Sequence, residues 1–483
     1  MTWLPILRLM GVLLLQLSVF MLIPALLMLL DREPAIGMLS AAGITALTGL
    51  VLFVPGSRRP FALRSRQLFA ATTLSWVTLV AFATLPLILG PTRLSVTDAV
   101  FEAVSGITTT GATVMTGLDD LPRGVLLWRS LIQWIGGIGI IVMGIAILPF
   151  LSVGGMRLFH TESSDWSEKA VPRTNKLASA IGVVYLGMSA LCALLYYLGG
   201  MSGFDAICHA MTTLATGGFA NYDASFGHFA GTPYLLVVAS VFMLASGLPY
   251  VLYVRALQGQ GGIRGFFGDE QVRGVLVFVL MVTSLVGLYL LASGTRDGSS
   301  AHLHALFNVV SVVTTTGYAS HDYGSWGGAM TMTFLFLMFV GGASGSTSGG
   351  MKMFRTQLGF AVLQNQLRSL VHPRGVFTVR FNGRAVPDEV LRSVLGFAFF
   401  FFLTIAALAL GLALLGLDPL TSLSGAVSAV TNVGPGLGER IGPAGHFQSL
   451  PEAGKWLLGI GMLLGRLEIM TVIVLLTPAF WRG

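Results

Sequence analysis

Long runs of apolar residues, separated by short polar segments, make up most of this chain. Each run reaches or approaches the ~20 residues that a helix needs to cross the hydrocarbon core of a bilayer. We therefore expect about ten transmembrane helices. They fall at residues 7–30, 37–54, 68–89, 124–151, 177–198, 233–254, 274–293, 330–355, 390–415 and 456–478, with an interruption inside the eighth.

The composition favours an all-α membrane protein. Of the 483 residues, 54% are hydrophobic and only 10% are charged, and the mean hydropathy is +0.80. These values are typical of proteins that cross a bilayer and exclude an ordinary soluble domain. The first apolar run is too long for the core of a signal peptide and has no small-residue cleavage site after it, so we expect a retained helix.

Positive charge gathers on one side of the predicted topology. If both termini are cytoplasmic, the inner segments hold most of the 28 Lys and Arg residues, as the positive-inside rule requires. The outer segments carry a surplus of acidic residues, which concentrates cations near an entrance. The net charge of +7 therefore reflects topology and does not indicate a nucleic-acid partner. Cys192 and Cys208 give neither a disulfide framework nor a metal-ligand spacing.

Four short outer segments share one pattern, a small amphipathic run followed by a turn of glycine and hydroxyl residues. They are FEAVSGITTTGAT (101–113), ICHAMTTLATGGF (207–219), FNVVSVVTTTGYA (307–319) and SGAVSAVTNVGPG (424–436). We align them on Gly111, Gly217, Gly317 and Gly434. Three of the four then carry a serine six residues earlier, at Ser105, Ser311 and Ser428. This regularity predicts four equivalent loops around one axis.

Each segment lies between two spans, so the repeating unit is span, short segment, loop, span. About ten residues form about 15 Å of helix, half the thickness of the hydrocarbon core. A half-length helix that returns as extended backbone is a re-entrant pore loop, tolerated only where it lines water or packs inside protein. We therefore expect about ten helices with four re-entrant pore loops in a pseudo-fourfold, K⁺-channel-like arrangement. The predicted divisions are an N-terminal two-helix extension (1–56) and four pore repeats (57–155, 156–256, 257–372 with a broken second helix, and 373–483).

The chemistry of a cation pore explains the glycines and hydroxyls. A dehydrated K⁺ ion exchanges its water for stacked rings of carbonyl oxygens, and glycine adopts dihedral angles that a side chain forbids. Each half-helix also points its negative C-terminal end toward the axis. Packing of small residues between membrane helices is the competing explanation. In the pore interpretation we expect further oxygen ligands at the inner end, from the hydroxyls of Thr109, Thr110, Thr216, Thr315 and Thr316.

The turns TTTGA, ATGGF, TTTGY and NVGPG look like degenerate versions of the TVGYG filter of K⁺ channels. With the N-terminal helix pair and the broken late helix GGASGSTSGGMK, the chain resembles the Trk/Ktr/HKT superfamily of K⁺ transporters, and within it the bacterial TrkH subunits. The second glycine of TVGYG is matched only by Gly436, so we expect moderate selection of K⁺ over Na⁺. The resemblance implies K⁺ contacts at Thr109, Thr110, Gly111, Ala112, Ala215, Thr216, Gly217, Gly218, Thr315, Thr316, Gly317, Tyr318, Asn432, Val433, Gly434 and Pro435.

The same resemblance implies a K⁺ uptake subunit in the cell (inner) membrane, with K⁺ as the transported ion, no organic cofactor and no catalytic residues. It also implies a homodimer and a cytoplasmic nucleotide-binding TrkA-type regulatory subunit. The basic stretch 368–392 is either a solvated loop or part of the surface where TrkA-type subunits dock. Within it, Asn382-Gly383 predicts the turn of a short hairpin.

The segment 341–350, GGASGSTSGG, interrupts the eighth span. Five glycines at about 1 kcal/mol each disfavour helix by about 5 kcal/mol, so we expect a flexible loop lining a cavity. It resembles the intramembrane gate of the superfamily, and a passive packing hinge is the alternative. A phosphate-binding loop requires Gly-Lys before Ser or Thr, a pattern that Gly350-Met351-Lys352-Met353 does not match. The predicted gate residues are Gly341, Gly342, Gly345, Ser346, Thr347, Gly349, Gly350 and Arg466.

Arg466 stands near the middle of the last apolar run, where an ionised group is costly unless it faces water or a partner. By resemblance it projects into the pore and repels cations. The alternative is a structural pairing with carbonyl groups or with Glu468, although Glu468 lies on a different helix face. Arg129 stands nearer a membrane edge, where we expect it to snorkel without a role.

Two other functional classes fit less well. A carrier for organic solutes built on inverted repeats needs an odd number of spans per unit, whereas two spans per unit leave all four loops on one side. An intramembrane enzyme needs a convergent catalytic set, yet the eight histidines are scattered and no HExxH or GxSxG motif occurs. An H⁺- or Na⁺-coupled K⁺ symporter on the same fold stays open.

Overall fold

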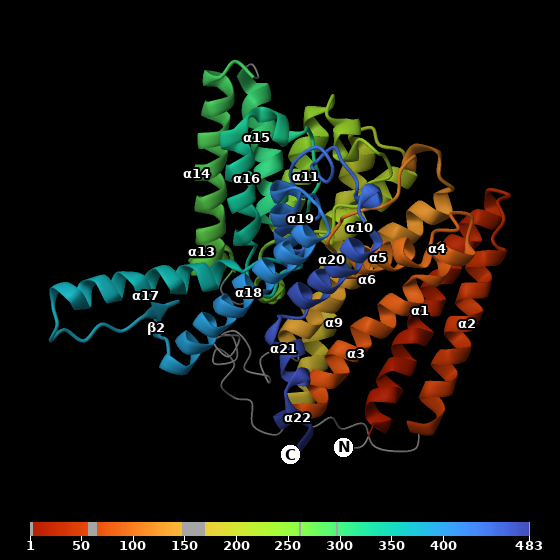
Figure 1. Cartoon of the computed structure of the whole chain (residues 1–483), viewed down its shortest axis with the longest axis horizontal. Coiled ribbons are helices and arrows are strands. Elements are labelled where there is room, and N and C mark those ends of the chain that lie inside the picture. The colour runs from red at the N-terminus through yellow and green to blue at the C-terminus, as the bar shows by residue number, and fades with distance from the viewer. Residues whose placement is uncertain (1–2, 57–64, 147–169, 260–261, 296–297, 483) are drawn as a thin grey trace.

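The computed structural model describes residues 3–56, 65–146, 170–259, 262–295 and 298–482, which form a bundle of helices (Figure 1). The 3₁₀ helices are η1 (Val54–Gly56), η2 (Leu118–Asp120), η5 (Ser225–Phe229), η6 (Tyr323–Trp326), η7 (Phe447–Ser449) and η8 (Val474–Leu476). The α-helices are α1 (Leu4–Leu30), α2 (Ile36–Phe53), α3 (Ser65–Ala83), α4 (Leu85–Leu89), α5 (Val96–Ile107), α6 (Arg123–Ala146), α9 (Ala170–Leu198), α10 (Gly203–Leu214), α11 (Pro233–Ser246), α12 (Tyr250–Leu257), α13 (Gly262–Gly268), α14 (Glu270–Ala292), α15 (Gly298–Val313), α16 (Gly328–Val340), α17 (Met353–Val371), α18 (Asp388–Leu414), α19 (Pro419–Thr431), α20 (Glu452–Arg466), α21 (Met470–Ile473) and α22 (Pro478–Arg482).

The predicted apolar runs are helical, but more of them are broken than the sequence indicated. Within the described ranges, seven helices are long and apolar enough to span a membrane, and up to nine if each bent pair counts as one span. The bends are 92° between α11 and α12 and 101° between α20 and the segment Met470–Leu476. We expected 233–254 and 456–478 to be continuous, and both expectations were wrong. The predicted end of the fourth span, 147–151, lies outside the described residues.

A proline accounts for the first of these bends. α11 ends at Ser246, and Pro249 stands immediately before α12 in an extended conformation with φ −66° and ψ 120°. Proline cannot donate the backbone hydrogen bond that a continuous helix would require. The eighth run breaks as predicted, because α16 ends after 13 residues at Val340 and the glycine-rich segment follows.

Four short helices, α5, α10, α15 and α19, occupy the predicted re-entrant positions with 12, 12, 16 and 13 residues. Capping side chains define where three of them begin. Ser95, Ser202 and Asp418 each accept a hydrogen bond from the backbone N–H three residues later. Hydrogen bonds from the side chain and backbone of Thr421 lower the pKa of the Asp418 carboxyl, so this cap stays charged.

Each re-entrant helix packs between the second helix of its own repeat and the second helix of the preceding repeat. In chain order, α5 contacts α6 and α20, α10 contacts α11 and α6, α15 contacts α16 and α11, and α19 contacts α20 and α16. Because the last repeat contacts the first, the four repeats close into a ring. The predicted pseudo-fourfold arrangement of pore loops is confirmed.

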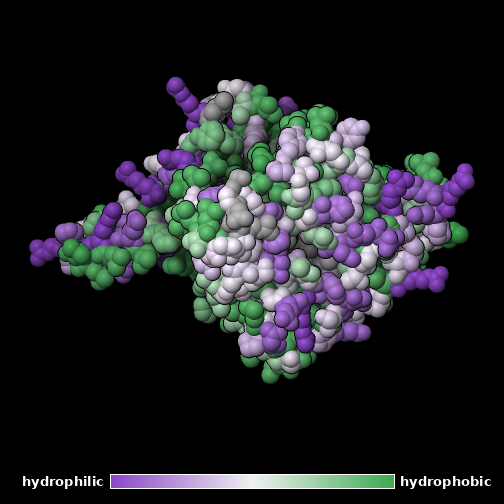
Figure 2. All heavy atoms as spheres, turned by 90° about the horizontal axis from the view of Figure 1, so that it is seen from above, coloured by the Kyte–Doolittle hydropathy of each residue, from purple (hydrophilic) through white to green (hydrophobic). Residues whose placement is uncertain are grey.

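Both ends of the chain lie at one end of the molecule, below the ring of short helices (Figure 1). Figure 2 looks onto the opposite face, where polar and near-neutral side chains cover much of the centre; apolar side chains gather along parts of the margin, between strongly hydrophilic side chains that project there. This distribution fits a protein whose rim contacts lipid and whose end faces water. Cys192 and Cys208 are buried free thiols, in agreement with the sequence.

The predicted hairpin is present beside α17, which projects from the bundle (Figure 1). Strands β1 (Arg380–Phe381) and β2 (Arg384–Ala385) pair antiparallel, with Phe381 opposite Arg384. Asn382 and Gly383 form the turn with φ of 49° and 76°. Positive φ at both central residues is what a tight two-residue hairpin turn requires, and Asn-Gly adopts it readily.

Candidate functional site

All four re-entrant helices end in the same backbone geometry. One residue just beyond the end of each helix lies in the left-handed region. Its φ is 54° at Thr109, 48° at Thr216, 57° at Thr315 and 56° at Asn432. The following N–H then bonds back to the helix, from Thr110 to Ser105, Gly217 to Thr212, Thr316 to Ser311 and Val433 to Ser428. Three of these left-handed residues are β-branched, which costs of order 1–3 kcal/mol each, and such strain clusters at functional sites.

The glycines that follow correct our alignment of the second loop. Positive φ occurs at Gly111 (86°), Gly218 (76°), Gly317 (80°) and Gly434 (109°). Gly218, and not Gly217, is therefore the equivalent of the other three marker glycines. Two adjacent glycines in ATGGF make either register possible in the sequence, and only the backbone angles distinguish them.

The corrected register also completes the hydroxyl pattern. A hydroxyl residue now stands six positions before the glycine in every loop, because Thr212 joins Ser105, Ser311 and Ser428. Ala215 becomes the C-cap of α10, as Thr108 is the C-cap of α5. We call the equivalent residues 109–112, 216–219, 315–318 and 432–435 pore loops 1 to 4. Phe219 thereby enters the set, in the place that Ala112 holds in pore loop 1.

The four pore loops close on one another through their glycines. A Cβ atom placed on Gly434 would lie 2.6 Å from the carbonyl oxygen of Thr110 in pore loop 1. Equivalent overlaps join Gly111 to the Gly217 oxygen, Gly218 to the Thr316 oxygen and Gly317 to the Val433 oxygen. Each glycine thus packs against a backbone carbonyl of the next loop around the ring, where any side chain would intrude.

The predicted hydroxyl ligands have different surroundings. Thr110 and Thr316 share hydrogen bonds of 2.7 and 2.8 Å with Thr108 and Thr314. The Thr216 hydroxyl donates to the Ala215 carbonyl at 2.7 Å. Among the described residues, the buried Thr109 hydroxyl has no hydrogen-bond partner. In pore loop 4, Asn432 replaces threonine and its amide donates to the Thr110 hydroxyl at 3.0 Å.

Residues 341–350, the glycine-rich loop, leave the helical path as predicted and cross below the pore loops. The loop is held by many hydrogen bonds. Gly349 donates to the Thr315 hydroxyl at 2.7 Å, and Gly350 donates to the Thr431 carbonyl at 2.8 Å. On its other side, Ala343 donates to the Gly247 carbonyl at 2.8 Å. The loop therefore contacts the break between α11 and α12 as well as the inner ends of two pore helices.

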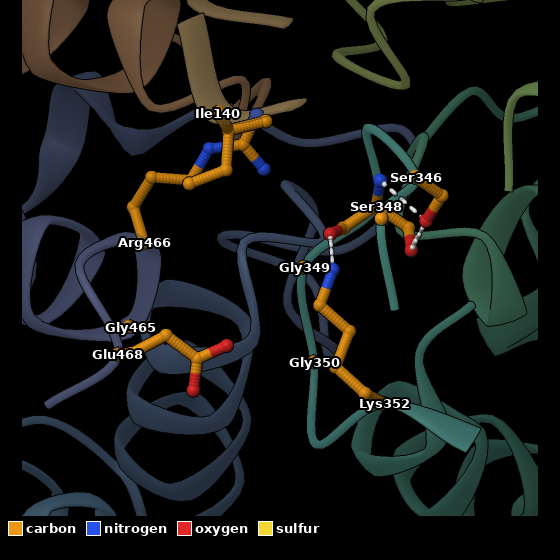
Figure 3. A pocket seen from close by; sticks show the side chains of 10 residues that line it. Ile140, Ser346, Ser348, Gly349, Gly350, Lys352, Gly465, Arg466 and Glu468 are labelled. Atoms are coloured by element: carbon orange, nitrogen blue, oxygen red, sulfur yellow. Dashed lines mark hydrogen bonds between the residues drawn. The ribbon is translucent and has the colours of Figure 1, made fainter. Parts of the chain in front are cut away.

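Arg466 is the last residue of α20 and is only 2% exposed. Its Nη1 donates to the Thr347 carbonyl at 2.8 Å, in the middle of the glycine-rich loop. Among the described residues, its Nε and Nη2 find no partner. Figure 3 shows the side chain running past Ile140 into the pocket that the glycine-rich loop lines, and away from Glu468.

Glu468 pairs with a different arginine. Its carboxylate accepts from Arg355 Nη2 at 2.6 Å, and both side chains are buried. The Arg355 guanidinium also lies 3.7 Å from the ring centroid of Phe397. Glu468 has φ of 58°, which explains why α20 cannot continue past it. Lys352 also faces the pocket and donates to the Ser348 carbonyl (Figure 3).

With this geometry established, comparison with known proteins identifies the family. Residues 40–482 match the family model TrkH, described as cation transport protein. The chain belongs to the TrkH family. It is 56% identical to the Trk system potassium uptake protein TrkI of Halomonas elongata, over 99% of this chain and 97% of that protein. It is 36% identical to the Trk system potassium uptake protein TrkH of Escherichia coli strain K12, over 98% of each.

A solved structure of the TrkH family has the same fold. The crystal structure of the potassium transporter TrkH from Vibrio parahaemolyticus superposes with a TM-score of 0.93 at 37% identity and covers 100% of both chains. The resemblance stated from the sequence is thus confirmed. Among the described residues no group of three or more His, Cys, Asp or Glu side chains is placed to hold a metal ion.

The prediction for Arg129 of this TrkH-family chain was also wrong. Arg129 does not snorkel to a membrane edge, because it is 1% exposed and its Nε pairs with Glu102 at 2.9 Å. Glu102 is itself fully buried on α5 and also accepts from the backbone N–H of Val114 at 3.0 Å. The ion pair with Glu102 offsets the cost of burying the Arg129 charge, and sequence alone does not place these two side chains together.

Proposed function

We propose that this chain is the ion-translocating subunit of a Trk-type K⁺ uptake system, with the permeation path on the axis of the four pore loops. The observation that carries the proposal is the closed ring of glycines, each packed on a carbonyl of the next loop. Rings of backbone carbonyls replace the water of a K⁺ ion. The relatives named as potassium uptake proteins support K⁺ as the ion.

The proposed K⁺ contacts are the pore loops. Backbone oxygens at the inner end are supplemented by the hydroxyls of Thr109, Thr110, Thr216, Thr315 and Thr316. The negative C-terminal ends of α5, α10, α15 and α19 meet beneath the ring and stabilise a cation there. Only Gly436 matches the second glycine of the TVGYG motif. We therefore propose moderate rather than strict selection against Na⁺.

The glycine-rich loop and Arg466 are the proposed gate. The loop lies below the pore loops, and Arg466 places a positive charge against it. Together they obstruct a cation leaving the ring, by volume and by electrostatic repulsion. Opening then requires the loop to move and the contact between Arg466 and Thr347 to break. The alternative role, a structural pairing of Arg466 with carbonyl groups, predicts no effect on flux per folded molecule.

The chain is a multi-pass membrane protein with several apolar helices. We further propose that both termini are cytoplasmic in the cell inner membrane, and that it works as a homodimer with a nucleotide-binding TrkA-type subunit. The projecting α17 and the basic residues that follow it offer a surface for such a subunit (Figure 1). The proposed repeats keep the boundaries given above, of which 57 and 155–156 lie outside the described residues.

Tracer flux into liposomes tests the proposal. The purified protein is reconstituted, and uptake of radioactive Rb⁺ is measured with unlabelled K⁺ or Na⁺ as competitor. We expect K⁺ to suppress Rb⁺ uptake more strongly than Na⁺ does. Repeating the assay with a pH or Na⁺ gradient distinguishes a channel from a coupled symporter. Absence of protein-dependent Rb⁺ uptake, at normal folded yield and with a TrkA-type subunit supplied, would overturn the proposal.

A further inference from the structure

Two of the buried polar side chains of helix α6, Arg129 and Gln133, lie one turn apart on the face between α5 and α10. Arg129 is 1% exposed and Gln133 is fully buried. Side chains four residues apart lie on one face of a helix, one turn above the other. Because α6 packs on the first two re-entrant helices, this face looks directly at pore loops 1 and 2. Buried polar groups need hydrogen-bond partners. Gln133 bonds to the backbone of pore loop 2, and Arg129 bonds to the Ala220 carbonyl directly after it.

Gln133 brackets the glycine of pore loop 2. Its Nε2 donates to the Gly217 carbonyl at 2.7 Å, and its Oε1 accepts from the Phe219 N–H at 3.0 Å. The two bonds lie on either side of Gly218, the residue with positive φ. The Gly217 oxygen is also the atom against which Gly111 of pore loop 1 packs. One amide therefore fixes the direction of a carbonyl at the contact between the two loops.

Arg129 extends the same support by one turn. Its Nη1 donates to the Ala220 carbonyl at 2.9 Å, and its guanidinium lies 4.2 Å from the Phe219 ring centroid. Its Nε pairs with Glu102, which also accepts from Val114 beyond pore loop 1. Pore loops 1 and 2 are thus joined through side chains of α5 and α6.

The other three contacts between pore loops are built differently. The amide of Asn432 joins pore loops 4 and 1. The Tyr318 hydroxyl of pore loop 3 shares a hydrogen bond with Thr212 of α10. The glycine-rich loop bridges Thr315 of pore loop 3 and the Thr431 carbonyl at the end of α19. Gly136 and Gly465 pack on equivalent carbonyls, of Ile107 and Val430. By that equivalence Met462 of α20 stands where α6 has Gln133.

We propose that Gln133, supported by Arg129, is a positioning residue that determines the selectivity of the pore for K⁺ over Na⁺. This inference rests on the proposed function. A carbonyl held by an amide cannot turn freely toward a smaller ion, so the width of the ring at pore loops 1 and 2 is set by protein contacts. Without the amide, the Gly217 carbonyl and the Phe219 N–H lose their partners and the ring loosens on this side.

Two substitutions of Gln133 test the proposal in reconstituted liposomes. Gln133→Met keeps the length of the side chain, copies the residue of α20 and removes both amide bonds. Gln133→Glu keeps an acceptor for Phe219 but places a carboxylate oxygen against the Gly217 carbonyl. We expect both to lower the ratio of K⁺ to Na⁺ competition against Rb⁺ uptake by roughly three- to tenfold, the effect of losing one or two hydrogen bonds. Ser130→Ala, on the same helix, removes a hydroxyl that donates to Leu126 and should leave the ratio unchanged.

The readouts separate failure of this inference from failure of the proposed function. If the parent protein conducts and the pore-loop glycine variants lose selectivity, but folded Gln133→Met and Gln133→Glu match the parent, only the role of Gln133 is overturned. If neither variant yields a folded protein by size-exclusion chromatography, its role is structural and the inference also fails. If the parent does not conduct, the proposed function itself fails.

Discussion

Gly349 donates its backbone N–H to the hydroxyl of Thr315 at 2.7 Å, which joins the glycine-rich loop directly to pore loop 3. The next residue, Gly350, donates to the carbonyl of Thr431 at the end of the fourth re-entrant helix. The proposed gate is therefore hydrogen-bonded to one residue of the proposed filter, Thr315, and to the end of the helix that precedes pore loop 4. Movement of the loop necessarily frees a hydroxyl at the ring, so the two parts are mechanically coupled.

Thr315→Val should weaken the closed position of the loop. Valine keeps the shape and β-branching of threonine but cannot accept from Gly349, and an unmade buried hydrogen bond costs about 1 kcal/mol. We expect basal Rb⁺ flux to rise by roughly fivefold, since about 1.4 kcal/mol corresponds to tenfold. Thr314→Val is the matched control, because Thr314 bonds to Val310 and Thr316 and not to the loop. Equal flux in the two variants would show that the contact does not restrain the loop.

Gly218→Ser, Gly111→Ser and Gly317→Ser should each lower the preference of the pore for K⁺ over Na⁺. At these positions φ is positive and a Cβ atom would run into a carbonyl of the next loop, so the ring must distort. We expect a loss of roughly tenfold in the competition ratio, about 1.4 kcal/mol. If all these glycine variants fold at normal yield and keep the native selectivity, the pore loops are not the selectivity filter.

Arg466→Ala should raise cation flux, because it removes a positive charge and the bond to Thr347 from the proposed permeation path. Arg466→Lys keeps the charge and serves as the control, with flux close to the parent. Folded yield and Rb⁺ flux are measured together. Low yield of Arg466→Ala with unchanged flux per folded molecule would mean that the arginine is a structural partner only.

Deletion of residues 345–349 should give a constitutively permeable pore. The deletion removes the part of the glycine-rich loop that lies against Arg466, together with the Gly349 contact to pore loop 3. We expect Rb⁺ uptake without any regulatory subunit to exceed that of the parent. A well-folded deletion variant no more permeable than the parent would identify the segment as a passive hinge.

Arg129→Ala should destabilise the protein strongly, because it leaves Glu102 as an unpaired charge in a buried site. Breaking a buried ion pair from one side costs about 3–5 kcal/mol. The double variant Arg129→Met with Glu102→Met removes both charges and should recover part of that loss. Thermal unfolding in detergent measures both. A single variant as stable as the parent would show that Glu102 is satisfied by Thr113 and Val114 alone.

Much of this protein could be predicted from the sequence, because a bilayer imposes strict local rules. Apolar runs of sufficient length must be helices, since unpaired backbone groups are too costly in lipid. Regularly spaced Gly and Thr turns revealed the fourfold repeat, and five glycines in ten residues marked the interruption at 341–350. Asn382-Gly383 likewise predicted its hairpin. These features depend on backbone conformations that few residue types can adopt.

Only the tertiary structure decided the relations between residues that are far apart in the chain. The choice between Gly217 and Gly218 depended on the backbone angle beside a neighbouring loop, which adjacent glycines do not reveal. Arg129 looked like a rim residue until Glu102 and Ala220 were found beside it, and Gln133 gave no signal in the sequence. The sequence determined which segments enter the membrane and where the glycine-rich loop interrupts a span, because those preferences are local. The partners of each buried polar group were decided by the packing of the four repeats, because a hydrogen bond requires two segments that are distant in the sequence to lie next to each other in space.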